Sequence, residues 1–493
     1  MINTRNNLIN WPYILNNILY YSAICLVYGM LLYLAVQNLT YDFFWYDESG
    51  QFFISQGLNH FSPPLSSRGT IGDVITSNAY YNQDPGGYGV LLYIWTFFST
   101  NTVWLRFLSF LFMIGAIIFS ILACMQTLNS YKLAFLSGLL IFSLLGSSHF
   151  YELRAYSMEL CGIATGIWLM MWIYRSVSFK KIITASILLC FFATARYTTL
   201  IFCAIFACFI LVGILTSKLE RKLKIYYSVI FSFPLLVTAC LIYIFATQIQ
   251  NKNLEPLFYI SYFPEKKEFI IFLLVSVLIT LPFKIMGRWM RVLIIFFWCT
   301  NICFMILGFF SILPWGFYGL KGGPFWWLLE FTVFCSVSSL ITKKQPKLFS
   351  YWIVLIIVMF IVGRIIYTWG GSGLSRKYNM NVPNIIAVIK NNPGTIYVNR
   401  FGCPEVRFYF EYGCLKDRTK SAGYPEKFKF LNGIPHNRGR DKTLEINREK
   451  RKKLFFEEMP INSIMLGDYM REDSMWIDKF DRSIQYVNVK IIK

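Results

Sequence analysis

The sequence predicts a polytopic α-helical membrane protein that ends in a small soluble α/β domain. Three observations support this prediction: the chain of 493 residues is 56% hydrophobic, only 15% charged, and has a mean hydropathy of +0.49. An average soluble domain has about 25% charged residues, and even a large one buries only about 75% of the surface that its unfolded chain exposes. A chain of this composition therefore needs lipid around it, and its composition excludes disorder, collagen and a disulfide scaffold.

Membrane-spanning helices are predicted from apolar stretches of about 18 or more residues. About eleven such stretches lie before residue 370, so region 1–369 is predicted to be a transmembrane module. They cover residues 17–38, 103–128, 132–148, 156–174, 181–195, 198–216, 225–247, 268–285, 291–312, 324–341 and 349–368. The first stretch is too long for the apolar core of a signal peptide, and no small-residue cleavage site follows it.

The distribution of Lys and Arg predicts the orientation of these spans. One set of alternate turns, together with Arg5, carries 15 basic residues, and the other set carries 7. The basic-rich turns of a membrane protein face the cytoplasm, so we expect a cytoplasmic N-terminus, an outward loop 39–102 and an outward C-terminal segment. Because topology explains the placement of the basic excess, which gives a net charge of +21, nucleic acid is not an expected partner.

Loop 39–102 is longer than most connections in compact proteins, and long loops are usually functional. Residues 47–58 can form an amphipathic helix that lies on the membrane. Residues 86–98 are apolar but too few to cross the bilayer, so we expect a re-entrant or interfacial helix there.

The composition changes after Trp369, and segment 370–493 is predicted to be an extracytoplasmic α/β domain. We expect helices at 382–390, 405–412 and 444–458, and strands at 395–398, 463–466 and 484–492. The abundance of Ile, Asn, Lys and Phe suggests an AT-rich genome, so we predict a bacterial inner membrane with this domain periplasmic or extracellular. Such a compartment would permit a disulfide between Cys403 and Cys414.

Two adjacent carboxylates, Asp47 and Glu48, follow the first span on the predicted outer face. One interpretation is structural, because an acid can cap a helix that starts here and negative charge is favourable at a helix N-terminus. Capping needs a single acid, however, and two acids at a membrane surface are costly to place for packing alone. We therefore favour a general base, since a carboxylate at this boundary can take a proton from an acceptor hydroxyl.

The next two outward segments carry Glu152, Arg154 and Tyr156, and then Arg196 and Tyr197. A spacing of four lets Glu152 and Tyr156 share one face of a short helix. Tyr and Arg are also common as interfacial anchors and as snorkelling side chains, so both interpretations stay open on the residues alone. An anionic ligand would explain an Arg on the side that the positive-inside rule disfavours.

A Pro-Gly-Gly turn separates Asp84 from Tyr88 and could bring the backbone close to a ligand, although a plain turn into a helix is the simpler interpretation. Within the spans, the acids that need an explanation are Glu159 and Glu330. Most of the singled-out charges thus gather on one face, whereas channels and pumps more often place charges mid-membrane. This pattern favours a reaction between a lipid-linked anion and an acceptor at the outer surface.

The order of these motifs resembles that of the GT-C glycosyltransferases, and within them the protein O-mannosyltransferase and aminoarabinose transferase (ArnT-like) group. The similar segments are Asp47-Glu48, 84–95, Leu105-Arg106, 152–158 and 195–201, all within the first 215 residues. Asp84 and Arg196 stand where the family commonly has His, and Gly86 stands where it has a second Pro. Beyond residue 215 only the architecture is similar.

The resemblance implies an inverting transfer of a sugar from a polyprenyl-phosphate donor to an acceptor hydroxyl or phosphate of an envelope glycan, lipid or protein. Asp47 would be the base, and Glu48 and Glu152 would orient the acceptor or hold a divalent metal ion, which some relatives need and others do not. The leaving lipid phosphate would be neutralised by Arg154, Arg196 and Lys321. The substrate site would also be lined by Asp84, Tyr88, Arg106, Tyr156 and Tyr197.

Two alternatives belong to other functional classes. A polyprenyl-lipid or polysaccharide transporter without transferase chemistry would need charges along a path across the membrane, and the absence of two matching sequence halves argues modestly against a repeat-built transporter. A non-catalytic assembly factor that displays the tail domain would leave the clusters at Asp47 and Glu152 unexplained.

Overall fold

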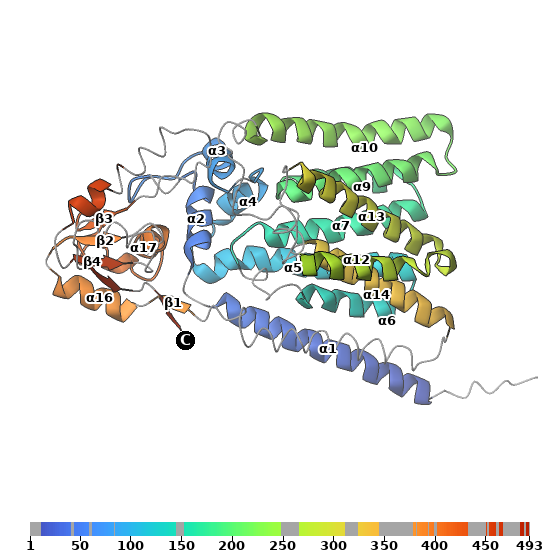
Figure 1. The fold of residues 1–493 in the computed structure, drawn as a ribbon, viewed down its shortest axis with the longest axis horizontal. Helices are drawn as coiled ribbons and strands as arrows, with labels where there is room; N and C mark the ends of the chain where they lie inside the picture. Colours follow the sequence, from blue (N-terminus) through green and yellow to red (C-terminus); the bar gives the residue numbers. More distant parts are fainter. Residues whose placement is uncertain are drawn as a thin grey trace, which may run out of the picture.

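The computed structural model describes residues 11–40, 44–58, 62–82, 84–143, 152–247, 266–310, 324–344, 378–380, 382–392, 394–398, 402–431, 450, 453–459, 463–466, 484–487 and 490–492. Most of these residues are helical, and the described strands are confined to the C-terminal part (Figure 1).

Six of the described helices are long and apolar enough to cross a membrane, so the chain is an integral membrane protein. They are α1 (Trp11–Leu39), α5 (Thr102–Leu128), α7 (Tyr156–Arg175), α9 (Tyr197–Leu215), α10 (Arg221–Ile242) and α13 (Arg288–Phe309). Each of them coincides with a predicted span. A π-helical segment, η3 (Tyr243–Thr247), continues α10, and a short 3-10 helix, η4 (Phe283–Ile285), precedes α13.

The described residues contain fewer full-length crossings than the eleven predicted ones. Four predicted spans coincide with α6 (Tyr131–Leu139) and its continuation η1 (Leu140–Ser143), α8 (Phe179–Ala193), α12 (Lys266–Thr280) and α14 (Pro324–Lys344). The apolar stretches of α12 and α14 are Phe269–Thr280 and Phe325–Leu340, which are shorter than the roughly 20 residues of a straight crossing. The eleventh predicted span, 349–368, lies outside the described residues.

Helix α7 is the most enclosed of the six long helices: 83% of its most apolar window is buried, against 17% in α10. It packs against α5 on one side and α9 on the other (Figure 1). Two glycines of α7 allow the close approach of α9 and of α8 (Phe179–Ala193). A Cβ atom at Gly166 would lie 2.2 Å from the ring of Phe206 on α9, and one at Gly162 would lie 2.8 Å from Phe192 on α8. Small residues are typical of such contacts between membrane helices.

Three short helices of the first long loop lie at one end of the helix bundle, between it and the sheet (Figure 1). They are α2 (Tyr46–Ser55), α3 (Ile71–Tyr81) and α4 (Gly87–Trp95), and α2 and α4 coincide with the helices expected there. The prediction missed α3, although Thr70 and Asp73, three residues apart, are the sequence signal of a capping box at a helix start. In the structure the Thr70 hydroxyl accepts from the Asp73 amide (3.3 Å), and the Thr70 amide donates to the Asp73 carboxylate (2.7 Å).

The C-terminal part contains α16 (Val382–Asn391), α17 (Gly402–Glu411), the short η6 (Lys416–Arg418) and two described sheets. The larger sheet is parallel, with the order β3-β2-β4-β5, and its strands are β2 (Ile396–Val398), β3 (Phe428–Phe430), β4 (Ser463–Leu466) and β5 (Ile484–Val487). In the smaller sheet β1 (Tyr378–Met380) pairs antiparallel with β6 (Lys490–Ile492). Helix α17 lies in the crossover from β2 to β3, as a parallel pair requires.

One predicted element of this segment needs a correction, while α16, α17, β2 and β4 lie where helices and strands were expected. The single predicted strand 484–492 is wrong, because β5 and β6 belong to different sheets; a continuous alternation of side chains cannot reveal a break between partners. Of the predicted helix 444–458, only residue 450 and residues 453–457 are described as helical.

The disulfide that an oxidising compartment would permit between Cys403 and Cys414 is not formed in the structure. Cys403 is a buried thiol near the start of α17, and Cys414 is an exposed thiol after its end. One sulfur packs into the interior while the other faces solvent, so the permissive compartment alone was not a sufficient reason for a bond.

We expect Gly166→Ala to destabilise the helix bundle, because its Cβ atom would overlap the Phe206 ring. Overpacking of this kind costs about 1–3 kcal/mol of the free energy of unfolding. The matched control is Gly29→Ala on α1, where an added Cβ would meet nothing within 4 Å. Thermal unfolding of the purified variants in detergent checks this: a midpoint for Gly166→Ala as high as that of the control would contradict the packing.

Candidate functional site

Four ion pairs connect segments that are far apart in the sequence. They join α2 to α5 and to segment 152–155, and they join the α3–α4 turn and α7 to the α8–α9 turn. The three predicted outer motifs and the Pro-Gly turn are therefore parts of one charged cluster.

The most deeply buried pair of this cluster is Glu48 on α2 and Arg106 on α5, which are 3% and 2% exposed. The guanidinium group donates from Nε to Oε1 and from one terminal nitrogen to Oε2 of Glu48, both at 3.0 Å. The backbone amide of Leu153 donates to the same carboxylate (3.1 Å), and the amide of Trp45 lies 3.4 Å from it. This geometry favours a positioning role for both side chains over the predicted contact with a substrate.

Asp47, the neighbouring acid, lies on a different side of α2 and has another partner. Its carboxylate pairs with Arg154 at 3.1 Å, and its side chain is 34% exposed. The Arg154 guanidinium lies 5.5 Å from the centre of the Tyr156 ring, and one terminal nitrogen is 3.5 Å from the Tyr156 hydroxyl. Of the two adjacent acids, Asp47 is thus the one that a substrate can reach.

Arg196, between α8 and α9, is shared by two carboxylates. It approaches Asp84 at 3.4 Å and Glu159 of α7 at 2.7 Å, and it lies over the Tyr156 ring at 4.6 Å. Glu159 also accepts a hydrogen bond from the Thr198 hydroxyl. The predicted intramembrane acid Glu159 is therefore a partner of Arg196, and it belongs to the charged cluster.

The Pro-Gly-Gly turn packs closely against another backbone segment. Gly86 has a φ of +101°, and the Gly87 amide donates to the Thr194 carbonyl (2.9 Å). A Cβ atom at Gly87 would lie 2.0 Å from the Thr194 hydroxyl oxygen, so only glycine allows this approach. The side-chain amide of Asn78 holds the Asp84 carbonyl (2.8 Å). The turn thereby brings Asp84 to Arg196.

Tyr88 and Glu152 are linked through Ser109 of α5. The hydroxyl groups of Tyr88 and Ser109 are 2.8 Å apart, and Ser109 donates to the Glu152 carbonyl (2.7 Å). Tyr88 is 1% exposed and Glu152 is 7% exposed. This buried link fixes the backbone of segment 152–155, which presents Arg154 to Asp47.

Neighbouring charges and burial shift the pKa values of Asp84 and Arg154 within the charged cluster. Burial raises the pKa of Asp84 to about 6; the nearby cations of Arg196 and Arg154 lower it, and the like charge of Glu159 raises it. Burial acts to lower the pKa of Arg154, but its polar and acidic neighbours outweigh this and the pKa lies above its ordinary value. These neighbours are the Tyr156 hydroxyl and the carboxylates of Asp47, Glu152 and Asp84.

Glu48, one of the two acids expected to orient the acceptor or hold a divalent metal ion, does not fit a metal ion in this arrangement, because both its oxygens face guanidinium nitrogens. The neighbouring Asp47 is paired with Arg154. Across the part of the chain that the structure describes, no group of three or more His, Cys, Asp and Glu side chains could hold a metal ion.

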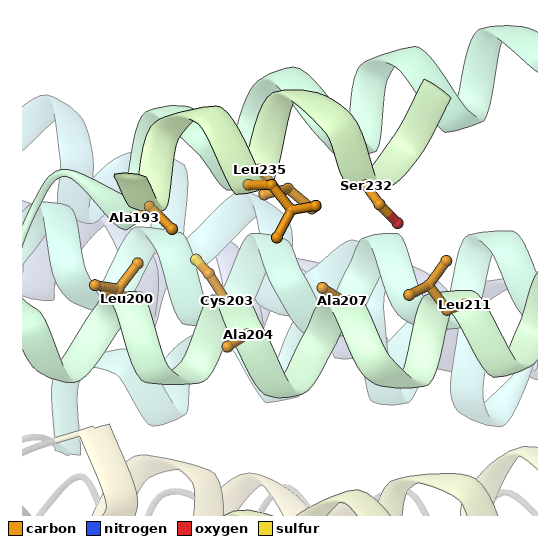
Figure 2. A pocket seen from close by; sticks show the side chains of 10 residues that line it. Ala193, Leu200, Cys203, Ala204, Ala207, Leu211, Ser232 and Leu235 are labelled. Carbon is orange, nitrogen blue, oxygen red and sulfur yellow. The ribbon is translucent and has the colours of Figure 1, made fainter. Parts of the chain in front are cut away.

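An apolar cavity of about 330 Å³ lies between α9 and α10 and reaches Ala193 at the end of α8 (Figure 2). Its walls are formed by Leu200, Cys203, Ala204, Ala207, Leu211, Ser232, Leu235, Leu236 and Ala239. Small side chains on α9 leave the space open, and α10 covers it. The cavity begins three residues before Arg196 and continues away from the charged cluster.

The remaining predicted residues have simpler positions. Tyr197 is the half-buried first residue of α9, Glu330 is half-buried on α14, and Lys321 lies outside the described residues. Sequence analysis missed Ser109, Thr194 and the amide of Leu153, because they contribute backbone or hydroxyl contacts that no charged motif marks.

No model of a known protein family matches the chain, and a search of curated proteins found no match. The family resemblance therefore stays a prediction that rests on the motifs and on the cluster that they form.

The raised pKa of Asp84 gives a pH dependence with a definite sign. An unfolded Asp titrates near pH 3.9, so between about pH 4 and 6 the folded protein binds more protons than the unfolded chain. The free energy of unfolding then falls as the pH rises through this window, by up to about 3 kcal/mol, and is constant above it. Asp84→Asn removes this slope.

Unfolding midpoints of wild type and Asp84→Asn in detergent, measured from pH 4 to 7, check the prediction. As the pH rises, the unfolding midpoint of Asp84→Asn should increase relative to that of wild type. The midpoint of Asp417→Asn, which changes an exposed acid, should depend on pH as that of wild type does. Parallel curves for wild type and Asp84→Asn would contradict the assignment.

Proposed function

We propose that the chain is an integral-membrane glycosyltransferase of the GT-C type. It would move a sugar from a polyprenyl-phosphate donor to a hydroxyl or phosphate of an envelope glycan, lipid or protein. The observation that carries this proposal is the partly exposed Asp47, paired with Arg154 in a cluster that adjoins the apolar cavity. A base, cations for a phosphate and room for a lipid chain are the parts that such a transfer needs.

In the proposed reaction Asp47 takes the proton of the acceptor hydroxyl. The acceptor oxygen then forms a bond to the anomeric carbon while the bond from this carbon to the phosphate oxygen breaks. The electron pair goes to the departing polyprenyl phosphate, whose charge a guanidinium group stabilises. The pairing with Arg154 at 3.1 Å supports this role, because it orients the carboxylate.

Arg154 is the better placed of the two guanidinium groups for the departing phosphate. It has one ion-pair partner among the described carboxylates and is 19% exposed, whereas Arg196 is held between Asp84 and Glu159 and is 11% exposed. Both face the Tyr156 ring, at 5.5 and 4.6 Å. Arg196 would then orient the site more than it binds the phosphate.

The cavity between α9 and α10 supports a lipid-linked donor. Nearly all of its described lining is apolar, and it extends from the end of α8, beside Arg196, along the two helices. We propose that the first isoprene units of the donor lie there, with the phosphate near Arg154.

The membrane arrangement belongs to the same proposal. We infer eleven spans, a cytoplasmic N-terminus, and an extracytoplasmic 370–493 domain at a bacterial inner membrane. The ion pair of Glu48 on α2 with Arg106 on α5 and the contacts of α2 with α17 support placing loop 39–102 and this domain on the same side. The basic-rich turns on the other side support its assignment as cytoplasmic.

The first experiment compares wild type with Asp47→Asn in proteoliposomes that contain a panel of polyprenyl-phosphate sugars and a crude envelope acceptor fraction. Mass spectrometry measures the release of free polyprenyl phosphate. Loss of a general base typically costs roughly 10²–10⁴-fold in rate, so release should fall by at least about 100-fold while donor binding is retained. Asp417→Asn, an exposed acid of the C-terminal part, is the matched control.

Three outcomes are informative. Release by wild type and the control, with loss in Asp47→Asn, supports the transferase. Equal release by all three keeps the enzyme but excludes Asp47 as its base. Binding of the donor lipid without release, for every donor in the panel, overturns the enzyme and favours a transporter.

A second prediction concerns the cavity. Ala207→Trp should fill part of it and raise the KM for the donor by about tenfold, with little change in kcat at saturating donor, because the lipid chain is bound equally in the ground and transition states. The control is Val229→Trp on α10, which is 59% exposed and lies outside the cavity. Equal kinetics of the two variants would show that the donor chain binds elsewhere.

A further inference from the structure

We propose that Tyr409, on α17 of the C-terminal part, is a positioning residue for α2 and thereby for the side chains of Asp47 and Glu48. This assignment rests on the proposed function, and it gives the C-terminal part a role in the reaction. The argument follows a continuous set of contacts from α17 to the charged cluster.

The first contact is a buried hydrogen bond across the two parts of the chain. The backbone amide of Phe44 donates to the Tyr409 hydroxyl, and both residues are 0% exposed. Phe44 lies two residues before the start of α2, so its amide has no partner within that helix. A buried amide without a partner is costly, and Tyr409 supplies the partner from outside the membrane module.

Aromatic packing extends the same contact along α2. The Phe408 ring lies 4.7 Å from Phe44 and 4.9 Å from Phe52, and the Tyr412 ring lies 4.9 Å from Phe52. Phe44 precedes α2 and Phe52 belongs to its second half. Helix α17 therefore holds α2 near both ends, which fixes its direction as well as its position.

A buried arginine fixes the chain that leaves α2. Arg407 is 1% exposed, pairs with Glu411 at 3.2 Å and lies 4.5 Å over the Phe53 ring. Its two terminal nitrogens donate to the Ser62 and Pro63 carbonyls at 2.9 and 3.2 Å. The guanidinium group thus joins α17 to the loop between α2 and α3.

The contacts reach the charged cluster through Phe44. The Arg106 guanidinium lies 4.8 Å from the Phe44 ring, and it holds Glu48 by two hydrogen bonds of 3.0 Å. Asp47 is one residue away on the same first turn of α2. If Phe44 shifts, the first turn of α2 shifts with it, and the 3.1 Å pair of Asp47 with Arg154 loses its geometry.

Removal of the Tyr409 hydroxyl should therefore affect the chemical step more than binding. Tyr409→Phe keeps the ring and its packing, so the protein should fold. We expect kcat to fall by about tenfold with an unchanged KM, because small displacements of catalytic groups affect the transition state most. Tyr397→Phe is the control: it removes a hydroxyl of the same part, which donates to the Glu458 carbonyl at 3.5 Å.

Hydrogen–deuterium exchange tests the positioning itself, without any assumption about activity. In the full-length protein in detergent, Tyr409→Phe should speed exchange in residues 44–50 and 152–155, with only a small fall in the unfolding midpoint because the Phe44 amide loses its partner. Arg407→Lys, which keeps a positive charge beside Glu411 but loses the two-pronged contact, should instead loosen residues 56–66.

The outcomes separate this inference from the proposed function. Faster exchange in Tyr409→Phe, with Tyr397→Phe at wild-type rates, supports the positioning role even if no donor is turned over. Unchanged exchange at 44–50 overturns it, whether or not the wild type is a transferase. A fall in kcat of the same size in both Tyr variants would also overturn it.

Discussion

The buried pair of Glu48 and Arg106 is the interaction on which the arrangement of the site depends. It joins the first outer loop to α5, and its third partner, the Leu153 amide, joins both to the segment before α7. Two charges at 3% and 2% exposure are tolerated because both carboxylate oxygens and two of the guanidinium nitrogens have well-oriented partners; removal of one member of such a pair costs about 3–5 kcal/mol. The pair therefore fixes how α2, α5 and the segment before α7 lie relative to one another.

The acids of the cluster differ in burial and in their partners, so they can have different roles. Glu48 is bound on both oxygens and cannot meet a substrate, whereas Asp47 pairs with a single guanidinium and remains 34% exposed. Adjacent residues of a helix point about 100° apart, so one can face the interior while the other faces the site. Asp84 and Glu159 share Arg196, and the closer contact of Glu159, 2.7 Å against 3.4 Å, leaves Asp84 the weaker partner.

The sequence predicted the long helices and grouped the outer motifs, because apolar length and charge placement are local properties. It could not assign partners: nothing near Arg106 in the sequence points to Glu48, and Arg196 was expected to meet a phosphate while the structure gives it two carboxylates. The start of α3 could have been predicted from the capping box of Thr70 and Asp73 but was missed. The division of 484–492 between two sheets depends on distant strands, and so lay beyond any local pattern.

Helix α2 is contacted both by the membrane module and by the C-terminal part, so neither part alone fixes its position. Arg106 holds the first turn of α2 from the membrane module, and α17 holds its two ends through Phe44 and Phe52. A helix fixed from both directions cannot move with one part alone. The composition change after Trp369 therefore marks a boundary in sequence. All the described pairs of the charged cluster lie before it, but α17, after it, contacts the helix that carries Asp47 and Glu48.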